Sequence, residues 1–170
     1  MANTVQKLRL RGCSDTQISF ENSAVSGYAN GTNTSCQVFH TNGGNINFPT
    51  FGETLYETNA PTLPEISFNA ENNINDISSG EAELVAFVSR LKPDICDEIN
   101  LSLNDTASFS GGAFSADGAA DNFTGAYSSS PDTICSGDAD GTTSGCCLET
   151  TDCTGSSNAC YHFYQVLLSR

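Results

Sequence analysis

Basic side chains are scarce in this sequence. Six lysines and arginines stand against 20 aspartates and glutamates among 170 residues, which gives a formal net charge of −14. Proteins that bind nucleic acids use Lys and Arg to neutralise phosphates, so this composition argues against a nucleic-acid partner. An anionic membrane surface would be repelled for the same reason. The excess of acidic residues is typical of a well-solvated surface.

Long apolar runs are also missing: these residues include no stretch of about 18 apolar residues and no secretory signal. Val5 and Leu8 have helical spacing, and Gly12 follows as a stop signal. Because Thr4–Leu10 resembles the tail of a helix rather than its beginning, we expect residues 1–11 to be the remnant of a longer amino-terminal helix.

Cysteine, by contrast, is abundant. Five of the eight cysteines lie close together in a stretch rich in Ser, Thr, Gly and Asp: Cys135, Cys146, Cys147, Cys153 and Cys160. Ordering such a stretch costs about 1–2 kcal/mol per residue for the backbone, and there is little apolar surface to offset that cost. Disulfides therefore have to stabilise it, and disulfides persist where thiols are oxidised. We therefore expect the protein to lie outside the cytosol.

The length and the 38% hydrophobic content predict one domain, residues 1–170, with one modest core. Alternating polar and apolar residues predict strands at 17–21 and 65–69, and Asn42-Gly43 predicts a hairpin between 36–40 and 45–48. Residues 160–168 are apolar on both faces, which predicts a closing strand in the middle of the sheet.

Residues 78–104 are predicted to form two consecutive helices or one kinked helix. Ser78 and Glu81 match a capping box, and an apolar stripe at helical spacing runs from Leu84 to Leu91. Pro93 suits the first turn of a second helix. The following residues, 105–159, are predicted to be a disulfide-rich loop region, with scattered aromatic side chains that anchor it to the body: Phe109, Phe114, Phe123 and Tyr127.

Eight cysteines allow on the order of a hundred complete pairings, and the sequence does not select one. Proximity suggests Cys13 with Cys36, and Cys153 with Cys160. Cys96 then needs a distant partner among Cys135, Cys146 and Cys147. The two adjacent cysteines should point to different partners, because a bond between them would be strained. A zinc site is the competing interpretation, but no Cys-x-x-Cys pair exists and the sequence has only two histidines.

Two further sets of residues are candidates for chemistry. Asp138 and Asp140 begin a stretch that resembles a calcium loop, which Asp132 or a backbone carbonyl could complete, although a plain acidic turn is the favoured alternative. His40 and His162 are the candidates for proton transfer near neutral pH. Because no Gly-x-Ser-x-Gly elbow presents a nucleophile, we expect no enzymatic activity.

Several blocks of the sequence taken together resemble a known group of proteins. They are residues 12–22, 27–30, 35–40, 95–100 and 161–170. This series resembles the bacterial type IV pilin-like and pseudopilin-like proteins. The resemblance implies an α+β fold, with an antiparallel sheet packed on an apolar helix that spans the inner membrane, short helices, and disulfides that staple the carboxyl-terminal loops. Some pseudopilins hold calcium in a loop of that region.

The resemblance also implies a function. The chain would be the head of a structural subunit of a type IV pilus or a type II secretion-like system. It would lie in the periplasm or at the cell surface of a bacterium, anchored in the inner membrane, in contact with other pilin-like subunits or secretion-system proteins. A processing site and a glutamate near the mature start, which pilins carry upstream, do not lie in these residues, so filament assembly itself is not predicted. The alternative is a secreted cell-surface binding module whose acidic carboxyl-terminal loops hold calcium or another ligand.

Overall fold

The computed structural model describes residues 1–23, 26–28, 33–57, 66–74, 77, 80–104, 122–135, 144–150 and 160–170. Within these residues no helix is long and apolar enough to cross a bilayer. The helices are α1 (Ala2–Leu10) and α2 (Pro93–Asn104), with three short 3-10 helices, η1 (Asp15–Gln17), η2 (Thr34–Cys36) and η3 (Glu53–Leu55).

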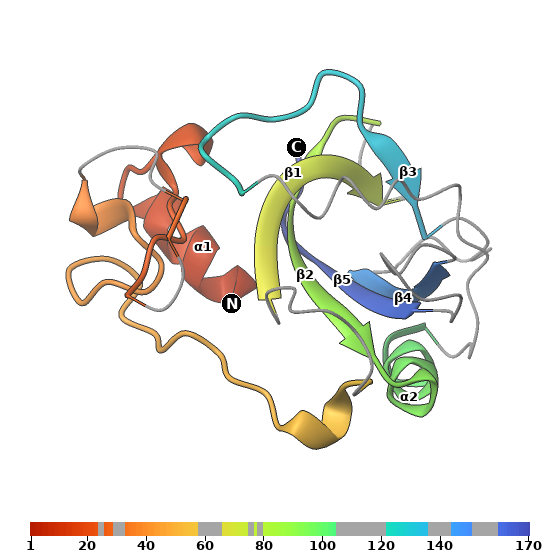
Figure 1. The fold of residues 1–170 in the computed structure, drawn as a ribbon. Coiled ribbons are helices and arrows are strands. Elements are labelled where there is room, and N and C mark those ends of the chain that lie inside the picture. Colours follow the sequence, from red (N-terminus) through yellow and green to blue (C-terminus); the bar gives the residue numbers. More distant parts are fainter. Residues whose placement is uncertain are drawn as a thin grey trace.

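The fold is mixed α/β and is built on a curled sheet of five strands (Figure 1). The strands, in spatial order, are β3 (Asp132–Ile134), β1 (Ile66–Ile74), β2 (Glu83–Leu91), β5 (Cys160–Leu168) and β4 (Gly145–Thr150). β1 and β2, β2 and β5, and β5 and β4 pair in antiparallel fashion, whereas β1 and β3 are parallel. The expectation of an antiparallel sheet is therefore wrong for β3, which joins in parallel.

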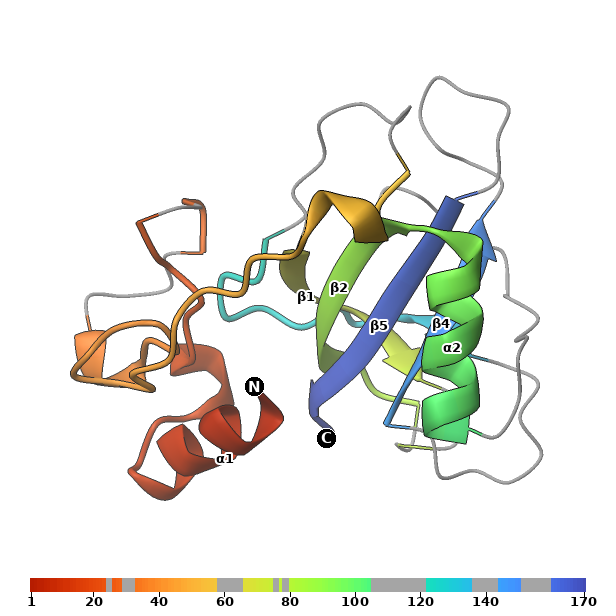
Figure 2. The same ribbon diagram turned by 90° about the horizontal axis from the view of Figure 1, so that it is seen from below.

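The sheet separates two apolar clusters, because successive side chains of a strand point to opposite faces. Leu84 and Val88 of β2 belong to the larger cluster, on the side where α1 and α2 pack. Val85 and Phe87 point the other way, into a smaller cluster within the curl. In Figure 2, α1 and α2 lie at opposite ends of the sheet. Two cores on two faces explain why almost every residue of β2 is buried.

A disulfide joins the two edges of this sheet. Cys135 follows β3 directly, Cys146 lies in β4, and the two are bonded. Since β3 and β4 are the outermost strands, the bond holds the curled sheet together across its open side. Both sulfurs are buried in the cluster inside the curl.

The prediction of a helix over 78–91 is wrong, because Glu83–Leu91 is strand β2. The apolar positions fit helical spacing, but they form a nearly continuous run rich in β-branched and aromatic side chains, which is equally typical of a strand buried on both faces. The capping-box residue Ser78 lies outside the described residues. The second half of the prediction is confirmed: Pro93 is the first residue of α2.

The closing strand is confirmed, since β5 spans Cys160–Leu168 and has a neighbour on each side. The strand predicted at 65–69 is also confirmed and continues to Ile74. The prediction that 105–159 is loop is wrong in two places, because β3 and β4 both fall within it. Phe123 does anchor its segment, with only 2% of its surface exposed, while Phe109 and Phe114 lie outside the described residues.

The amino-terminal hairpin is not formed. Residues 36–40 and 45–48 are joined by a turn, but neither is a strand, and the segment predicted as a strand at 17–21 makes a single parallel bridge, Ser19 to Gln37. The turn folds back onto the backbone of residue 37. The approach is so close that a Cβ at Gly43 would collide with the carbonyl oxygen of Gln37. Ile18 and Phe20 are both fully buried, so this segment fills the space beside the sheet rather than extending it.

Candidate functional site

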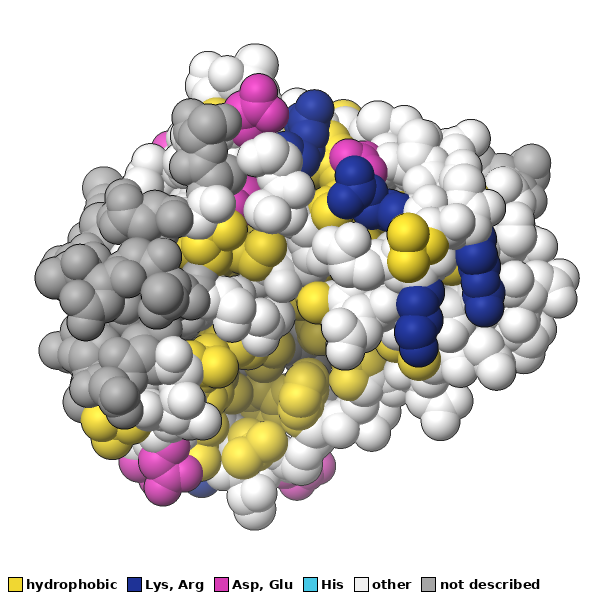
Figure 3. All heavy atoms as spheres, turned by 180° about the vertical axis from the view of Figure 1, so that it is seen from behind, with side chains coloured by type: hydrophobic (Ala, Val, Ile, Leu, Met, Phe, Trp, Pro, Cys, Tyr) yellow, Lys and Arg dark blue, Asp and Glu magenta, His cyan; other side chains and the backbone are white. Residues whose placement is uncertain are grey.

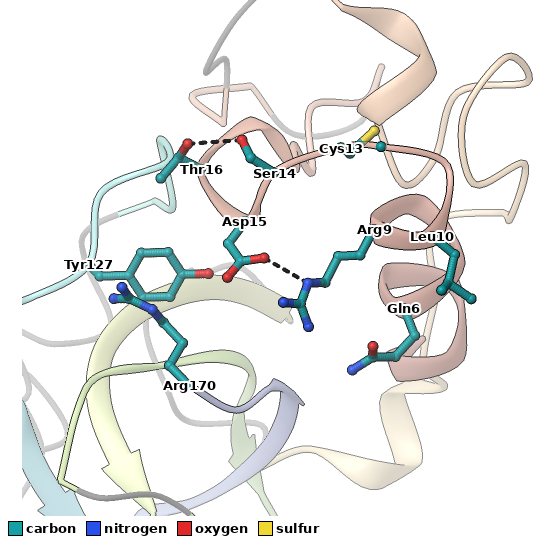
Figure 4. A pocket seen from close by; sticks show the side chains of 10 residues that line it. Gln6, Arg9, Leu10, Cys13, Ser14, Asp15, Thr16, Tyr127 and Arg170 are labelled. Atoms are coloured by element: carbon teal, nitrogen blue, oxygen red, sulfur yellow. Dashed lines mark hydrogen bonds and ion pairs between the residues drawn. The ribbon is translucent and has the colours of Figure 1, made fainter.

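A pocket of about 660 Å³ lies beside the carboxyl end of α1 (Figure 4). Its walls come from four parts of the chain: α1, the turn at residues 12–16, Tyr127 before β3, and Arg170 after β5. The volume falls within the range of about 300–1,000 Å³ that is usual for ligand pockets. It is therefore large enough to be a candidate binding site.

Local geometry turns the chain back over α1. Gly12 follows α1 with a φ of +96°, a conformation that favours glycine, and its N–H donates to the Arg9 carbonyl. η1 then begins with a capping box, in which the Ser14 N–H donates to the Gln17 side chain at 3.0 Å. This reversal places Asp15 against α1, where its carboxylate lies 2.7 Å from Nε of Arg9.

The other wall is an aromatic ring with a guanidinium on its face. Arg170 follows β5, and its guanidinium carbon lies 4.4 Å from the centre of the Tyr127 ring. Tyr127 also meets Phe123 edge to face, at 5.3 Å between ring centres. The ring is thereby fixed against the core, and Arg170 gains a cation–π contact.

The Tyr127 hydroxyl is enclosed and makes no hydrogen bond within the described part of the chain. Its pKa is raised to about 12, chiefly because burial disfavours the charged form; the Asp15 carboxylate adds to the rise, while Arg170 and Arg9 oppose it. At neutral pH the hydroxyl is therefore protonated and can donate.

Positive charge gathers around this pocket. α1 and the residue after it carry Lys7, Arg9 and Arg11, and Arg170 joins them, so four of the six basic residues lie at this end of the chain's fold. Figure 3 shows a group of Lys and Arg side chains over the part of the surface where α1 lies. In a chain of net charge −14, this is a local reversal of sign.

The sequence placed three bases at the amino end and one at the carboxyl end, but nothing in it indicated that the two ends meet. They meet because α1 packs against β5, so that Arg170, just beyond β5, comes near Arg9. Tyr127 was expected only to anchor a loop. The uneven distribution of the six bases was the one signal available in the sequence.

The two histidines lie in different settings, and both have structural partners. His40 lines a separate pocket of about 520 Å³ together with Glu21 and Gln37, and its Nδ1 accepts from the Asn42 N–H at 3.1 Å. His162 is 5% exposed, stacks on Phe87 at 5.0 Å, and its Nδ1 accepts from the Arg90 N–H at 3.4 Å.

Burial, and to a lesser extent the Arg90 charge, together lower the pKa of His162 from 6.5 to about 4. As the pH falls below about 6.5, His162 becomes protonated in the unfolded chain, whereas in the folded chain it stays neutral until about pH 4. The free energy of unfolding therefore decreases as the pH falls through this window. Between pH 7 and pH 5 we expect a loss of about 2 kcal/mol in unfolding free energy from His162. Urea unfolding at both pH values measures it.

His162→Asn should keep the acceptor for the Arg90 N–H and abolish this part of the pH dependence. His40→Asn, at the turn, is the matched control and should retain it. An equal loss between pH 7 and pH 5 in wild type and His162→Asn would show that His162 does not titrate as described.

The expected calcium residues are not brought together by the described part of the chain. Asp132 begins β3 with its side chain exposed, whereas Asp138 and Asp140 lie outside the described residues. Those residues include no group of three His, Cys, Asp or Glu side chains placed to hold a metal ion. The calcium site stays a prediction.

The described part of the chain contains three disulfides. Cys13 is bonded to Cys36, the pair that proximity suggested, and Cys96 is bonded to Cys147, one of its three candidate partners. The adjacent cysteines do point to different partners, because Cys146 bonds to Cys135. The suggested Cys153–Cys160 pair lies outside the residues whose side chains are described.

Comparison of the chain with protein-family models, with curated proteins and with solved structures gives no match. The function has to be argued from the disulfides and the basic pocket.

Proposed function

We propose that this chain is the extracytoplasmic head of a pilin-like subunit and that its role is structural, performed through contact with other proteins. The observation that supports this best is the placement of the three disulfides. One ties the end of α1 to η2, one ties α2 to β4, and one joins the two edges of the sheet. The bonds therefore constrain the amino-terminal segment, the attachment of α2 to the sheet, and the curl of the sheet itself.

This placement suits a head that is exposed outside the cytosol. Each disulfide contributes about 2–4 kcal/mol, and such bonds persist only in an oxidising compartment. The acidic surface keeps the head soluble, and α1 fixes its own position through buried Val5 and Leu8. A helix continuing upstream of α1 would anchor the head in the inner membrane, and the partners would be other pilin-like subunits or secretion-system proteins.

The proposal contains no catalytic step. His162 is enclosed within the curl of the sheet, and His40 uses its Nδ1 to stabilise a turn. Neither is arranged beside an activated nucleophile among the described residues, so both histidines have a sufficient structural account.

Thiol trapping in the cells that make the protein tests the compartment. A maleimide reagent added to intact cells before lysis should find none of the eight cysteines reactive, whereas reduction in denaturant should expose all eight. Mechanical shearing of the same cells tests the structural role, because a subunit of a surface assembly should be recovered in the sheared, sedimentable fraction. Reactive thiols, or recovery only in the cytosol, would contradict the proposal.

The effect of calcium on the melting temperature distinguishes a structural head from the second candidate function, a surface binding module. The observation in its favour is that the Cys135–Cys146 bond closes the stretch that carries Asp138 and Asp140, with Asp132 just before it. For a structural head we expect the same melting temperature with and without calcium. A rise of several degrees that is lost in Asp138→Ala would favour the binding module instead.

A further inference from the structure

The pocket beside α1 contains several hydrogen-bond donors that are not used within the described residues. Arg9 engages Asp15 through Nε, and its two terminal nitrogens form no hydrogen bond or ion pair with another described residue. Arg170 lies over the Tyr127 ring and has no carboxylate partner among the described residues. Figure 4 shows Arg9 extending from α1 toward Tyr127 and Arg170.

Guanidinium donors without acceptors favour the binding of an anion in this pocket. The charges of the pocket side chains favour an anion with a single negative charge. Its side chains carry two positive charges, Arg9 and Arg170, and one negative charge, Asp15. A carboxylate adds a single negative charge and matches the fork of a guanidinium. A phosphate dianion would bring a second negative charge next to Asp15, where like charges repel. At physiological salt the Debye length is about 8 Å, so these local charges outweigh the distant acidic surface.

An exposed leucine on the pocket wall further restricts the class of ligand that would fit. Leu10 is 88% exposed, the most exposed of the large apolar side chains described, and it lines the same pocket as Arg9. A small free acid would leave this side chain in water. A polypeptide with an acidic residue next to an apolar one would satisfy the guanidinium groups and cover Leu10 together.

We propose that this pocket binds a polypeptide segment of a partner protein, in which an acidic side chain meets Arg9 and Arg170 while a neighbouring apolar side chain covers Leu10. The inference rests on the proposed role in protein–protein contact and assigns that contact to one place. The partner is defined by chemistry: an acidic residue adjacent to an apolar one.

Blocked tetrapeptides titrated into the ¹⁵N-labelled protein at fixed ionic strength test the ligand class. Acetyl-Ala-Glu-Leu-Ala-amide should shift the NMR signals of Arg9 Nε–H and of the backbone amides at residues 12–16. A peptide with Gln in place of Glu should bind at least about ten-fold more weakly, because a hydrogen-bonded charge is lost. Peptides with Ser in place of Leu, and free acetate, should also bind more weakly than the first peptide.

Arg170→Gln tests the geometry, because it removes one of the two guanidinium groups that line the pocket. Peptide affinity should fall about ten-fold while the melting temperature is maintained. Lys92→Gln, which removes a positive charge outside the pocket, is the matched control and should bind normally.

Equal affinity for the Glu and Gln peptides, affinity for acetate equal to that for the Glu-Leu peptide, or unaltered binding by Arg170→Gln would overturn the inference. Those results would leave the thiol and shearing measurements as they stand. Conversely, reactive thiols in the cell would contradict the proposed function even if the peptide bound.

Discussion

Replacing Cys96 and Cys147 together with alanine should lower the free energy of unfolding by about 4 kcal/mol. The two residues are 51 apart in the sequence, and closing a loop of that length removes conformational entropy from the unfolded chain. Both cysteines are also buried, so their removal leaves unfilled space next to the sheet. Urea unfolding of the oxidised wild type and of the double variant gives the difference.

The same bond should control how firmly α2 is attached. β4 is an outer strand, and α2 covers its free edge: the Asn100 side chain donates to the Cys147 carbonyl at 2.8 Å and accepts from the Cys147 N–H at 2.7 Å. These hydrogen bonds satisfy backbone groups that an exposed edge would leave open. Without the disulfide, amide hydrogen exchange should increase most in α2 and β4.

Cys13→Ala with Cys36→Ala is the matched control, because it removes another buried disulfide at a different joint, 23 residues apart. It should destabilise by about 3 kcal/mol and increase exchange around α1 and η2 instead. Two outcomes would contradict the role of the Cys96–Cys147 bond in attaching α2 to β4. One is a loss of less than about 1 kcal/mol of unfolding free energy in the Cys96/Cys147 variant, and the other is increased exchange in the same elements in both variants.

The sequence predicted elements well where one physical constraint dominated. Pro93 fixes a helix start because it lacks an N–H and has a preset φ, and the apolar run in β5 has no polar face to expose. The stretch before Pro93 was assigned wrongly, because Leu84, Val85, Phe87 and Val88 satisfy helical spacing and a doubly buried strand equally well. Only the presence of β1 and β5 on either side decides between them, and pairing is a long-range property.

The candidate site was beyond the reach of sequence patterns for the same reason. Arg9 and Arg170 stand at opposite ends of the chain, and Tyr127 lies between two stretches without recognisable motifs. Their meeting depends on α1 packing beside the end of β5. The Cys13–Cys36 pair could be suggested because the two residues are close in the sequence, 23 apart. By contrast, Cys135–Cys146 joins the two sheet edges, whose positions the sequence did not reveal.

Phe20→Ala should be as damaging as the loss of a disulfide, at about 3–5 kcal/mol of unfolding free energy. The Phe20 ring has no exposed surface and stacks on Phe68 of β1, with 4.0 Å between ring centres and 7° between planes. It also meets Tyr28 and Phe123 edge to face, at 6.4 and 6.3 Å. These contacts join the amino-terminal segment, the first strand and the segment before β3, so one truncation opens a cavity at their common joint.

Phe20→Leu separates the two contributions, because it keeps most of the buried apolar volume and loses only the ring contacts, each worth about 0.5–1.5 kcal/mol. Its cost should be clearly smaller than that of the alanine variant. Phe48→Ala, which removes a partly buried ring that touches Phe39 at the rim of the same cluster, should also cost less. Urea unfolding of the three variants ranks their losses of unfolding free energy. If Phe20→Ala lost no more than Phe48→Ala, the surrounding residues would be able to fill the space of the missing ring. The attachment of the amino-terminal segment to the sheet would then not depend on Phe20.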